Sequence, residues 1–179
     1  MELDKQLIRK TMKQKRLFID KETFFHNSEI IFNKLINHPE YKKSSTIGIY
    51  VSMNNEVDTF RIIKHALKDH VVATPKVKGD TMDFYCIESL DDLKEGYFHV
   101  LEPTTNKYIS PSDIDLMIVP LLAYDQNKQR VGYGKGYYDK YFASGFKGYK
   151  LGLAFSWQEV SCIETDQFDY PIDEVLNEV

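Results

Sequence analysis

The stretch best suited to chemistry spans residues 130–139, where glycines fall at every second position: Gly132, Gly134 and Gly136. Glycine permits positive φ angles and lets backbone N–H groups approach a ligand without a clash from Cβ. A loop of this kind between a strand and a helix forms a concave site for an anion. Arg130 and Lys135 add positive charge suited to phosphate oxygens. The pattern therefore predicts a phosphate-binding loop.

Two common nucleotide-binding patterns do not fit this loop. A Walker loop needs GxxxxGK[ST], and the sequence does not contain it. A dinucleotide fingerprint needs GxGxxG, but counting from Gly132 puts Tyr137 at the third glycine position. The alternative interpretation is a tight turn whose glycines bind nothing, because GxGxG alone is a weak signal.

The flanking sequence predicts the elements that must hold this loop. Apolar spacing predicts a helix from Asp4 to about Phe18 and another from about Lys21 to Asn37, ending before Pro39. A third helix is expected over 58–68, with Asp58 or Thr59 as N-cap, and a fourth from Tyr137 to Phe142. Strands are expected over 46–51, 71–74 (stopped by Pro75), 82–87, 116–119, 151–155 and 174–176.

The alternation of strands and helices predicts a single α/β domain over residues 1–179. We expect a three-layer sandwich around a mostly parallel sheet, with a helical N-terminus. The runs TIGIYV and LMIVP are apolar enough to be central parallel strands, buried on both faces. The stretch 101–113 is expected to be a loop, either a lid or a simple connection.

Composition limits the class of protein. The chain has 179 residues, enough for one compact domain, and its net charge of −4 does not suit a nucleic-acid binder. Cys86 and Cys162 lie far apart and form neither a disulfide framework nor a zinc pair. The polar start MELDKQLIRK is not a signal peptide, and no apolar run is long enough to cross a bilayer. We expect a cytoplasmic monomer or weak dimer with small-molecule substrates and neither nucleic acid nor membrane as partner.

Residues 119–125 (VPLLAYD), followed by 130–139 (RVGYGKGYYD), resemble the signature of the 5-formyltetrahydrofolate cyclo-ligase family, roughly VPGLAFD and then RLGYGGGYYD. Other segments similar to the family follow in its order: Lys5 and Arg9, 52–59 (SMNNEVDT), 74–77 (TPKV), 101–103 (LEP) and 172–175 (IDEV). The resemblance spans nearly the whole chain. It departs at Leu121, Ile163 and Phe168, where the family often has glycine, proline and histidine.

The resemblance implies an enzyme that converts 5-formyltetrahydrofolate into 5,10-methenyltetrahydrofolate with release of ADP and phosphate. ATP, the co-substrate, phosphorylates the formyl oxygen, and N10 then attacks the activated carbon. Such a transfer needs positioning and charge neutralisation more than a covalent nucleophile.

The ATP site implied by the resemblance joins the N-terminal helix to the glycine loop. Lys5 and Arg9 lie one helical turn apart, so both can face one ligand. The remaining expected ATP contacts form one continuous run: Arg130, Val131, Gly132, Tyr133, Gly134, Lys135, Gly136, Tyr137 and Tyr138. Within this run Arg130, Lys135 and Tyr137 are expected to take part in catalysis.

Asp139 and Asp173 are the expected ligands of Mg²⁺, because hard cations bind carboxylate oxygens beside phosphates. For Asp139 the alternative is a charge in the first turn of a helix, where the helix dipole favours an acid. Asp173 lies far from Asp139 in sequence, so only the resemblance joins the two.

The expected folate contacts are Met53, Glu56 and Asp58, together with part of the glycine loop: Tyr133, Gly134, Lys135, Gly136 and Tyr137. If their segment is extended, Glu56 and Asp58 share a face, and a carboxylate there accepts hydrogen bonds from the pterin. The alternatives are an N-cap role for Asp58 and an ordinary core position for Met53.

Two other functions remain open from sequence. An RNA- or nucleotide-binding module could keep the fold without the reaction, using the basic first helix. Lys10, Lys13, Lys15 and Arg16 on that helix are, however, interpreted as a solvated face. A different small-molecule kinase with a similar loop would use ATP without any dependence on folate.

Overall fold

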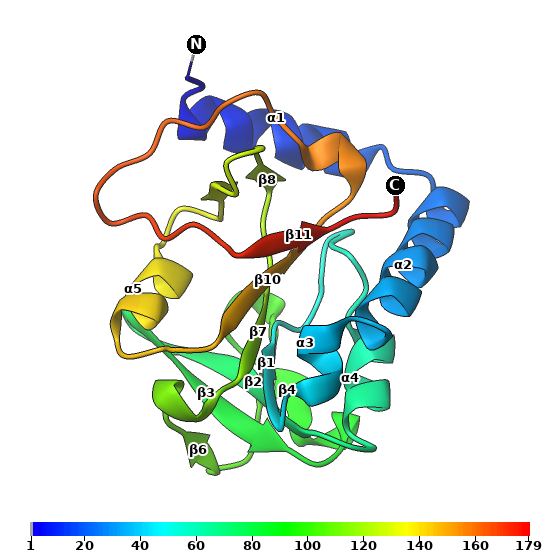
Figure 1. Cartoon of the computed structure of the whole chain (residues 1–179), viewed down its shortest axis with the longest axis vertical. Coiled ribbons are helices and arrows are strands. Elements are labelled where there is room, and N and C mark those ends of the chain that lie inside the picture. Colours follow the sequence, from blue (N-terminus) through cyan, green and yellow to red (C-terminus); the bar gives the residue numbers. More distant parts are fainter. Residues whose placement is uncertain (1) are drawn as a thin grey trace.

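The computed structural model describes residues 2–179 and is built around a seven-stranded sheet in the order β11-β10-β7-β1-β2-β3-β6 (Figure 1). The pairings from β11 to β2 are parallel, whereas β3 pairs antiparallel with both β2 and β6. The strands are β1 (Thr46–Ile49), β2 (Val71–Lys78), β3 (Thr81–Ile87), β6 (Tyr108–Ile109), β7 (Leu116–Val119), β10 (Tyr149–Leu153) and β11 (Glu174–Leu176). Two small antiparallel pairs lie outside this sheet: β4 (Leu93–Glu95) with β5 (Leu101–Pro103), and β8 (Ala123–Tyr124) with β9 (Arg130–Val131).

Helices lie on both sides of the sheet. In Figure 1, α2, α3 and α4 lie on one side, α5 lies on the other, and α1 crosses one end of the molecule beside β8. Their bounds are α1 (Lys5–Leu17), α2 (Lys21–Ile36), α3 (Pro39–Lys43), α4 (Phe60–Ala66) and α5 (Tyr137–Ala143).

The alternation of β7 divides the core into two layers. Leu116 and Ile118 pack with residues of α2 and α4, while Met117 and Val119 pack with residues of α5. All four side chains are fully buried, as expected of a central parallel strand. The expected three-layer α/β sandwich with a helical N-terminus is therefore confirmed.

A third cluster attaches α1 to the domain. Ile8 and Met12 pack against Leu122, Ala123 and Val131, which belong to β8, β9 and the segment before them. The N-terminal helix is thereby fixed against the strand that leads into the glycine loop.

Most predicted elements are confirmed, including the end of α2 before Pro39, and two local predictions are wrong. Strand β2 does not stop at Pro75 but continues to Lys78, and Pro75 pairs with Phe84. Beyond Ala73, β2 has no partner on the β1 side, so it is locally an edge strand that tolerates proline. The stretch 101–113 contains β5 and β6 rather than a plain loop, and Pro39 begins α3. Proline suits that first helical position because its missing N–H needs no partner there.

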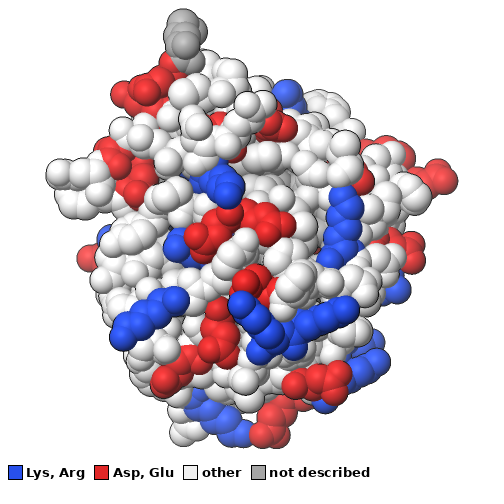
Figure 2. Space-filling view, viewed as in Figure 1, with Lys and Arg blue, Asp and Glu red and all other residues white. Residues whose placement is uncertain are grey.

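The surface carries mixed charge. Figure 2 shows Lys and Arg side chains interspersed with Asp and Glu on the face viewed. Within residues 2–179, no helix combines the length and the apolar character needed to cross a membrane.

Candidate active site

A cleft of about 1110 Å³ opens at the carboxyl ends of β1 and β7, where Tyr50 and Pro120 line it. From β1 the chain proceeds to β2 on one side, and the later strands β7, β10 and β11 lie on the other. The position between β1 and β7 is thus the switch point of the topology, where open α/β sheets bind ligands. Its walls include helix α1, the segment after β1 (residues 50–56), the glycine loop (residues 132–136) and residues 166–170.

The glycine loop runs from β9 into α5, as the sequence predicts. Gly134 has φ +100° and Gly136 has φ +70°, both in the region that favours glycine. Gly136 is also the N-cap residue of α5, so the backbone of the loop leads directly into a helix N-terminus. The exposed Lys135 lies between these two glycines and lines the cleft.

The remaining predicted loop residues divide between the cleft and its support. Tyr137 and Tyr138 line the cleft, and the Tyr137 hydroxyl donates a hydrogen bond to the Gly79 carbonyl at 3.1 Å. Val131 does not line the cleft; it is fully buried against α1. Its expected contact with ATP is therefore wrong for the side chain, which instead packs the loop onto the core.

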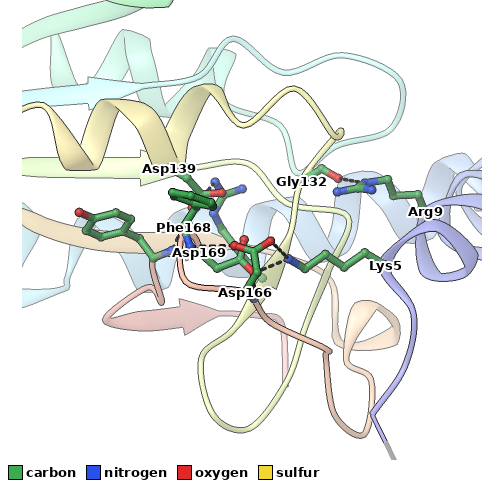
Figure 3. Close-up of polar contacts among 9 residues, drawn as sticks. Lys5, Arg9, Gly132, Asp139, Asp166, Phe168 and Asp169 are labelled. Carbon is green, nitrogen blue, oxygen red and sulfur yellow. Dashed lines mark hydrogen bonds and ion pairs between the residues drawn. The ribbon is translucent and has the colours of Figure 1, made fainter.

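Helix α1 contacts the loop directly. The Arg9 Nε donates a hydrogen bond to the Gly132 carbonyl at 2.9 Å, as Figure 3 shows. Lys5, one turn earlier, forms ion pairs with Asp169 and, at 3.6 Å, with Asp166. Both side chains line the same cleft, as their spacing predicts.

Arg130 lies in the cleft with an unused donor. Its side chain is only 6% exposed, and no acceptor among residues 2–179 reaches its Nε. The guanidinium lies over the Tyr138 ring, and its Nη2 is 3.6 Å from Asp139 Oδ1. Burial lowers the pKa of Arg130, and the Asp139 charge opposes that shift. A buried cation with a free N–H is well suited to an anionic ligand.

Three carboxylates line the cleft near Lys5 and Arg130: Asp139, Asp166 and Asp169. Asp139 Oδ1 accepts a hydrogen bond from the backbone N–H of Tyr170 at 3.1 Å, so Asp139 holds the residue next to Asp169. Within residues 2–179, no three His, Cys, Asp or Glu side chains converge closely enough to form a metal site by themselves.

The structure does not bring Asp173 to Asp139, which corrects the predicted ligand pair. Asp173 accepts a hydrogen bond from the backbone N–H of Lys150 at 2.7 Å and pairs with the Lys150 Nζ at 3.6 Å. These contacts lie at the amino ends of the parallel strands β10 and β11, whereas the cleft lies at the carboxyl ends. Asp169 occupies the position beside Asp139 instead.

The two acidic residues after β1, Glu56 and Asp58, lie in different surroundings. Glu56 is buried, accepts from the Met53 N–H at 2.9 Å and the Tyr133 hydroxyl at 2.7 Å, and lines the cleft with Met53. Asp58 does not line it and accepts from the Phe60 N–H at 3.1 Å, at the start of α4. The two therefore do not share the face that was expected, and the turn before them holds Asn54 and Asn55 at φ +50° and +62°.

Arg16 is the functional candidate that the sequence analysis missed. It was expected on a solvated face, yet it is 5% exposed and its Nη1 donates to the Tyr133 hydroxyl at 2.6 Å. The signal was available, since Lys5, Arg9, Met12 and Arg16 follow the i, i+4, i+7, i+11 spacing of one helix face.

The ionisation of Glu56 gives a first prediction. Burial raises its pKa above the ordinary 4.5, although hydrogen bonds from Tyr133 and Met53 and the charge of Arg16 oppose the shift. The stability that this carboxyl contributes is therefore full below 4.5 and is lost as pH rises through the raised pKa. Glutamine does not ionise. The melting temperature of Glu56→Gln should therefore increase relative to that of the wild type as pH rises from 4.5 through the raised pKa of Glu56.

Thermal unfolding of both proteins from about pH 4 to about pH 8 measures this difference. Tyr50, Tyr133 and Tyr138 also face Glu56, but burial raises their pKa values, so they stay neutral throughout. A difference that stays constant with pH would show that the Glu56 carboxyl is not perturbed by its surroundings.

Comparison with known protein families identifies one that matches almost the whole chain. The model of the 5-formyltetrahydrofolate cyclo-ligase family matches residues 2–178. The 5-formyltetrahydrofolate cyclo-ligase of Mus musculus is 30% identical over 189 residues, which cover 97% of this chain and 93% of the mouse protein. That of Mycoplasma genitalium is 30% identical over 97% of this chain and 98% of its own length.

Solved structures give the same result. The NMR structure of Aquifex aeolicus 5,10-methenyltetrahydrofolate synthetase matches with a TM-score of 0.87 at 33% identity, covering 96% of this chain and 88% of that one. The 5,10-methenyltetrahydrofolate synthetase from Mycoplasma pneumoniae matches with a TM-score of 0.82 at 27% identity, covering 99% and 100%. The similarity therefore extends over the cleft and all of its walls.

Proposed function

The chain belongs to the 5-formyltetrahydrofolate cyclo-ligase family, and we propose that it uses ATP and Mg²⁺ to convert 5-formyltetrahydrofolate into 5,10-methenyltetrahydrofolate. One observation carries this proposal within the structure. Tyr133 belongs to the glycine loop, and its hydroxyl donates a hydrogen bond to Glu56 in the segment after β1. This bond supports the proposal because the glycine loop, suited to phosphate, and the carboxylate of Glu56, suited to a ring with N–H donors, adjoin in one cleft.

The triphosphate of ATP is assigned to the glycine-loop end. Backbone N–H groups of residues 132–136 would bind the phosphates, supported by the positive charges of Lys5, Arg9, Arg130 and Lys135. The unused Nε donor of buried Arg130 suits a developing anionic charge. Tyr137 and Tyr138 complete this wall, and Tyr137 belongs with Arg130 and Lys135 beside the transferred phosphoryl group.

Asp139 and Asp169 would hold Mg²⁺. They fit the ion because both offer carboxylate oxygens at the phosphate end of the cleft, linked through the Tyr170 N–H. Mg²⁺ commonly binds one or two carboxylates together with substrate phosphates, so a protein-only cage is not required. When bound, the ion neutralises charge on the phosphates. Arg130 lies beside Asp139, and Lys5 pairs with Asp169.

The folate is assigned to the other end. The carboxylate of Glu56 would accept hydrogen bonds from the pterin amino and N–H groups. Met53 and the Tyr133 ring offer apolar surface to a flat ring, and Tyr97 and Phe98 stand exposed along the cleft. Asp58 has no part in this proposal because it does not line the cleft and instead accepts a hydrogen bond from the Phe60 N–H at the start of α4.

The reaction then needs two steps. The formyl oxygen attacks the γ-phosphorus of ATP and ADP leaves, which converts a poor leaving group into phosphate. N10 attacks the formyl carbon and loses its proton, and the C–O bond to phosphate breaks to give the cyclic amidinium. Arg130 and Lys135 neutralise the phosphoryl oxygens in both steps, while Glu56 orients the pterin.

A coupled assay tests the proposal. Protein, MgATP and 5-formyltetrahydrofolate are mixed, and the methenyl product is followed by its near-ultraviolet absorbance while ADP is measured. We expect product only when both substrates are present, with one ADP for each ring closed. ATP hydrolysis at full rate without folate would instead favour a different small-molecule kinase.

A further inference from the structure

A buried arginine joins three segments that are distant in sequence. Arg16 lies in the last turn of α1, and its Nη1 donates to the hydroxyl of Tyr133 in the glycine loop. That hydroxyl donates to Glu56 Oε2, and Glu56 Oε1 accepts from the Met53 N–H. The hydrogen bonds therefore connect helix α1, the glycine loop and the segment after β1.

The direction of this chain is fixed by its two ends. A guanidinium can only donate and an ionised carboxylate can only accept. The Tyr133 oxygen must therefore accept from Arg16, which leaves its own proton for Glu56. Tyr133 is 43% exposed and lines the cleft, while Arg16 and Glu56 hold its hydroxyl.

Arg16 also holds the segment after β1 through its backbone. Its carbonyl accepts a hydrogen bond from Asn55 Nδ2 at 3.0 Å. Asn54 and Asn55 both have positive φ, an uncommon conformation that persists where surrounding contacts stabilise it. One residue of α1 thus contacts both segments that form the folate end of the cleft.

Stability alone does not account for this arginine. Burying a cation is costly unless its donors are well paired, and an apolar residue of similar size often serves stability as well. In residues 2–179 the Nε of Arg16 has no hydrogen-bond partner, and its Nη2 reaches the Leu121 carbonyl only at 3.5 Å. Among the described residues, the one short hydrogen bond of the Arg16 side chain is the bond to Tyr133.

We propose that Arg16 is a positioning residue for the folate end of the site: it holds the Tyr133 hydroxyl, which in turn orients the Glu56 carboxylate toward the substrate. This inference rests on the proposed function, because it assigns Glu56 to the folate. Arg16 does not itself line the cleft, so its effect reaches the substrate only through Tyr133, Glu56 and the segment after β1.

The test compares Arg16→Met, Arg16→Lys, Tyr133→Phe and the double variant Arg16→Met with Tyr133→Phe. Lys15→Met is the matched control, since Lys15 is the exposed neighbour in the same helical turn and loses the same charge. For each protein, kcat and KM are measured for folate and for ATP, at a temperature below every melting point. Folate binding is also measured by calorimetry, which does not depend on turnover.

Arg16→Met should lower kcat/KM for folate by about 10- to 100-fold, the range expected when a reacting group is misplaced by an ångström or less. KM for ATP should change by less than about twofold, and Arg16→Lys should restore part of the loss. The double variant should be no worse than the more impaired single variant within about twofold, because both changes break one chain of contacts. Lys15→Met should behave as the wild type.

Independent effects that multiply in the double variant would overturn the inference, as would a normal folate kcat/KM in Arg16→Met. If Arg16→Met does not fold, Tyr133→Phe provides the test, because it removes one oxygen and leaves Arg16 in place. An unchanged KM for folate in Tyr133→Phe would then refute the role of the hydrogen bonds from Arg16 through Tyr133 to Glu56. If the wild type converts folate and the variants have the same kcat/KM as the wild type, the inference about Arg16 is wrong but the proposed function stands. A wild type that neither binds nor converts folate would overturn both.

Discussion

Asp139→Asn is expected to lose nearly all Mg²⁺-dependent activity while the protein stays folded. A neutral amide replaces a charged, hard ligand, and this should cost more than the roughly 10- to 100-fold lost with an outer-shell partner of a metal. The fold should survive because the amide oxygen can still accept the hydrogen bond from the Tyr170 N–H. Steady-state activity as a function of Mg²⁺ concentration, with thermal unfolding of the same sample, measures both effects.

Asp173→Asn is the matched control for this prediction. It makes the same chemical change at the other carboxylate that the family resemblance suggested, but at the amino ends of β10 and β11. We expect its Mg²⁺ dependence to match the wild type. If Asp173→Asn impairs activity as strongly as Asp139→Asn, or if Asp139→Asn loses stability in proportion to activity, the assignment of the metal to Asp139 and Asp169 is wrong.

Gly134→Ala should cause the second large loss, of roughly 10²-fold in kcat/KM for ATP. The φ of Gly134 is +100°, a conformation that costs about 1–3 kcal/mol for other residues. The added Cβ would lie 3.5 Å from the Arg9 guanidinium carbon, an ordinary contact, so the loss comes from the backbone conformation and not from a clash. The loop should relax away from its N–H-presenting conformation, so ATP binding should weaken more than folate binding in calorimetric titrations.

Gly145→Ala separates this effect from general backbone strain. Gly145 has φ +109°, similar to that of Gly134, and no atom of residues 2–179 outside its chain neighbours lies within 4 Å of its added Cβ. It does not line the cleft. The two variants should therefore lose comparable stability, while only Gly134→Ala loses ATP affinity. Equal ATP affinity in Gly134→Ala and the wild type would remove the glycine loop from the mechanism.

The spacing of apolar residues predicts most helices and strands of the fold, because these elements form from residues that are close together in the sequence. The apolar runs of β1 and β7 and the spacing of α1 required no knowledge of their neighbours. Pro75 was misread because its effect depends on pairing, since β2 is an edge strand only where β1 has ended. The pairing of β5 with β4 likewise depends on a partner several residues away.

The site divides in the same way. The glycine loop and Arg9 were predictable because their spacing carries the chemistry. Asp173 and Asp169 are four residues apart, and only the folded path of residues 166–170 along the cleft shows which of them faces it. Arg16 looked like another solvent-exposed cation, because burial on the inner face of α1 depends on what packs against it.

Isotope transfer tests the central claim most directly. 5-Formyltetrahydrofolate carrying ¹⁸O in the formyl group is converted with MgATP in ordinary water, and the released phosphate is examined by mass spectrometry. If the formyl oxygen attacks the γ-phosphorus and leaves with it, each phosphate released with methenyl product should carry one ¹⁸O atom. Methenyl product formed together with unlabelled phosphate would contradict the account, because the formyl oxygen would then have left without being phosphorylated.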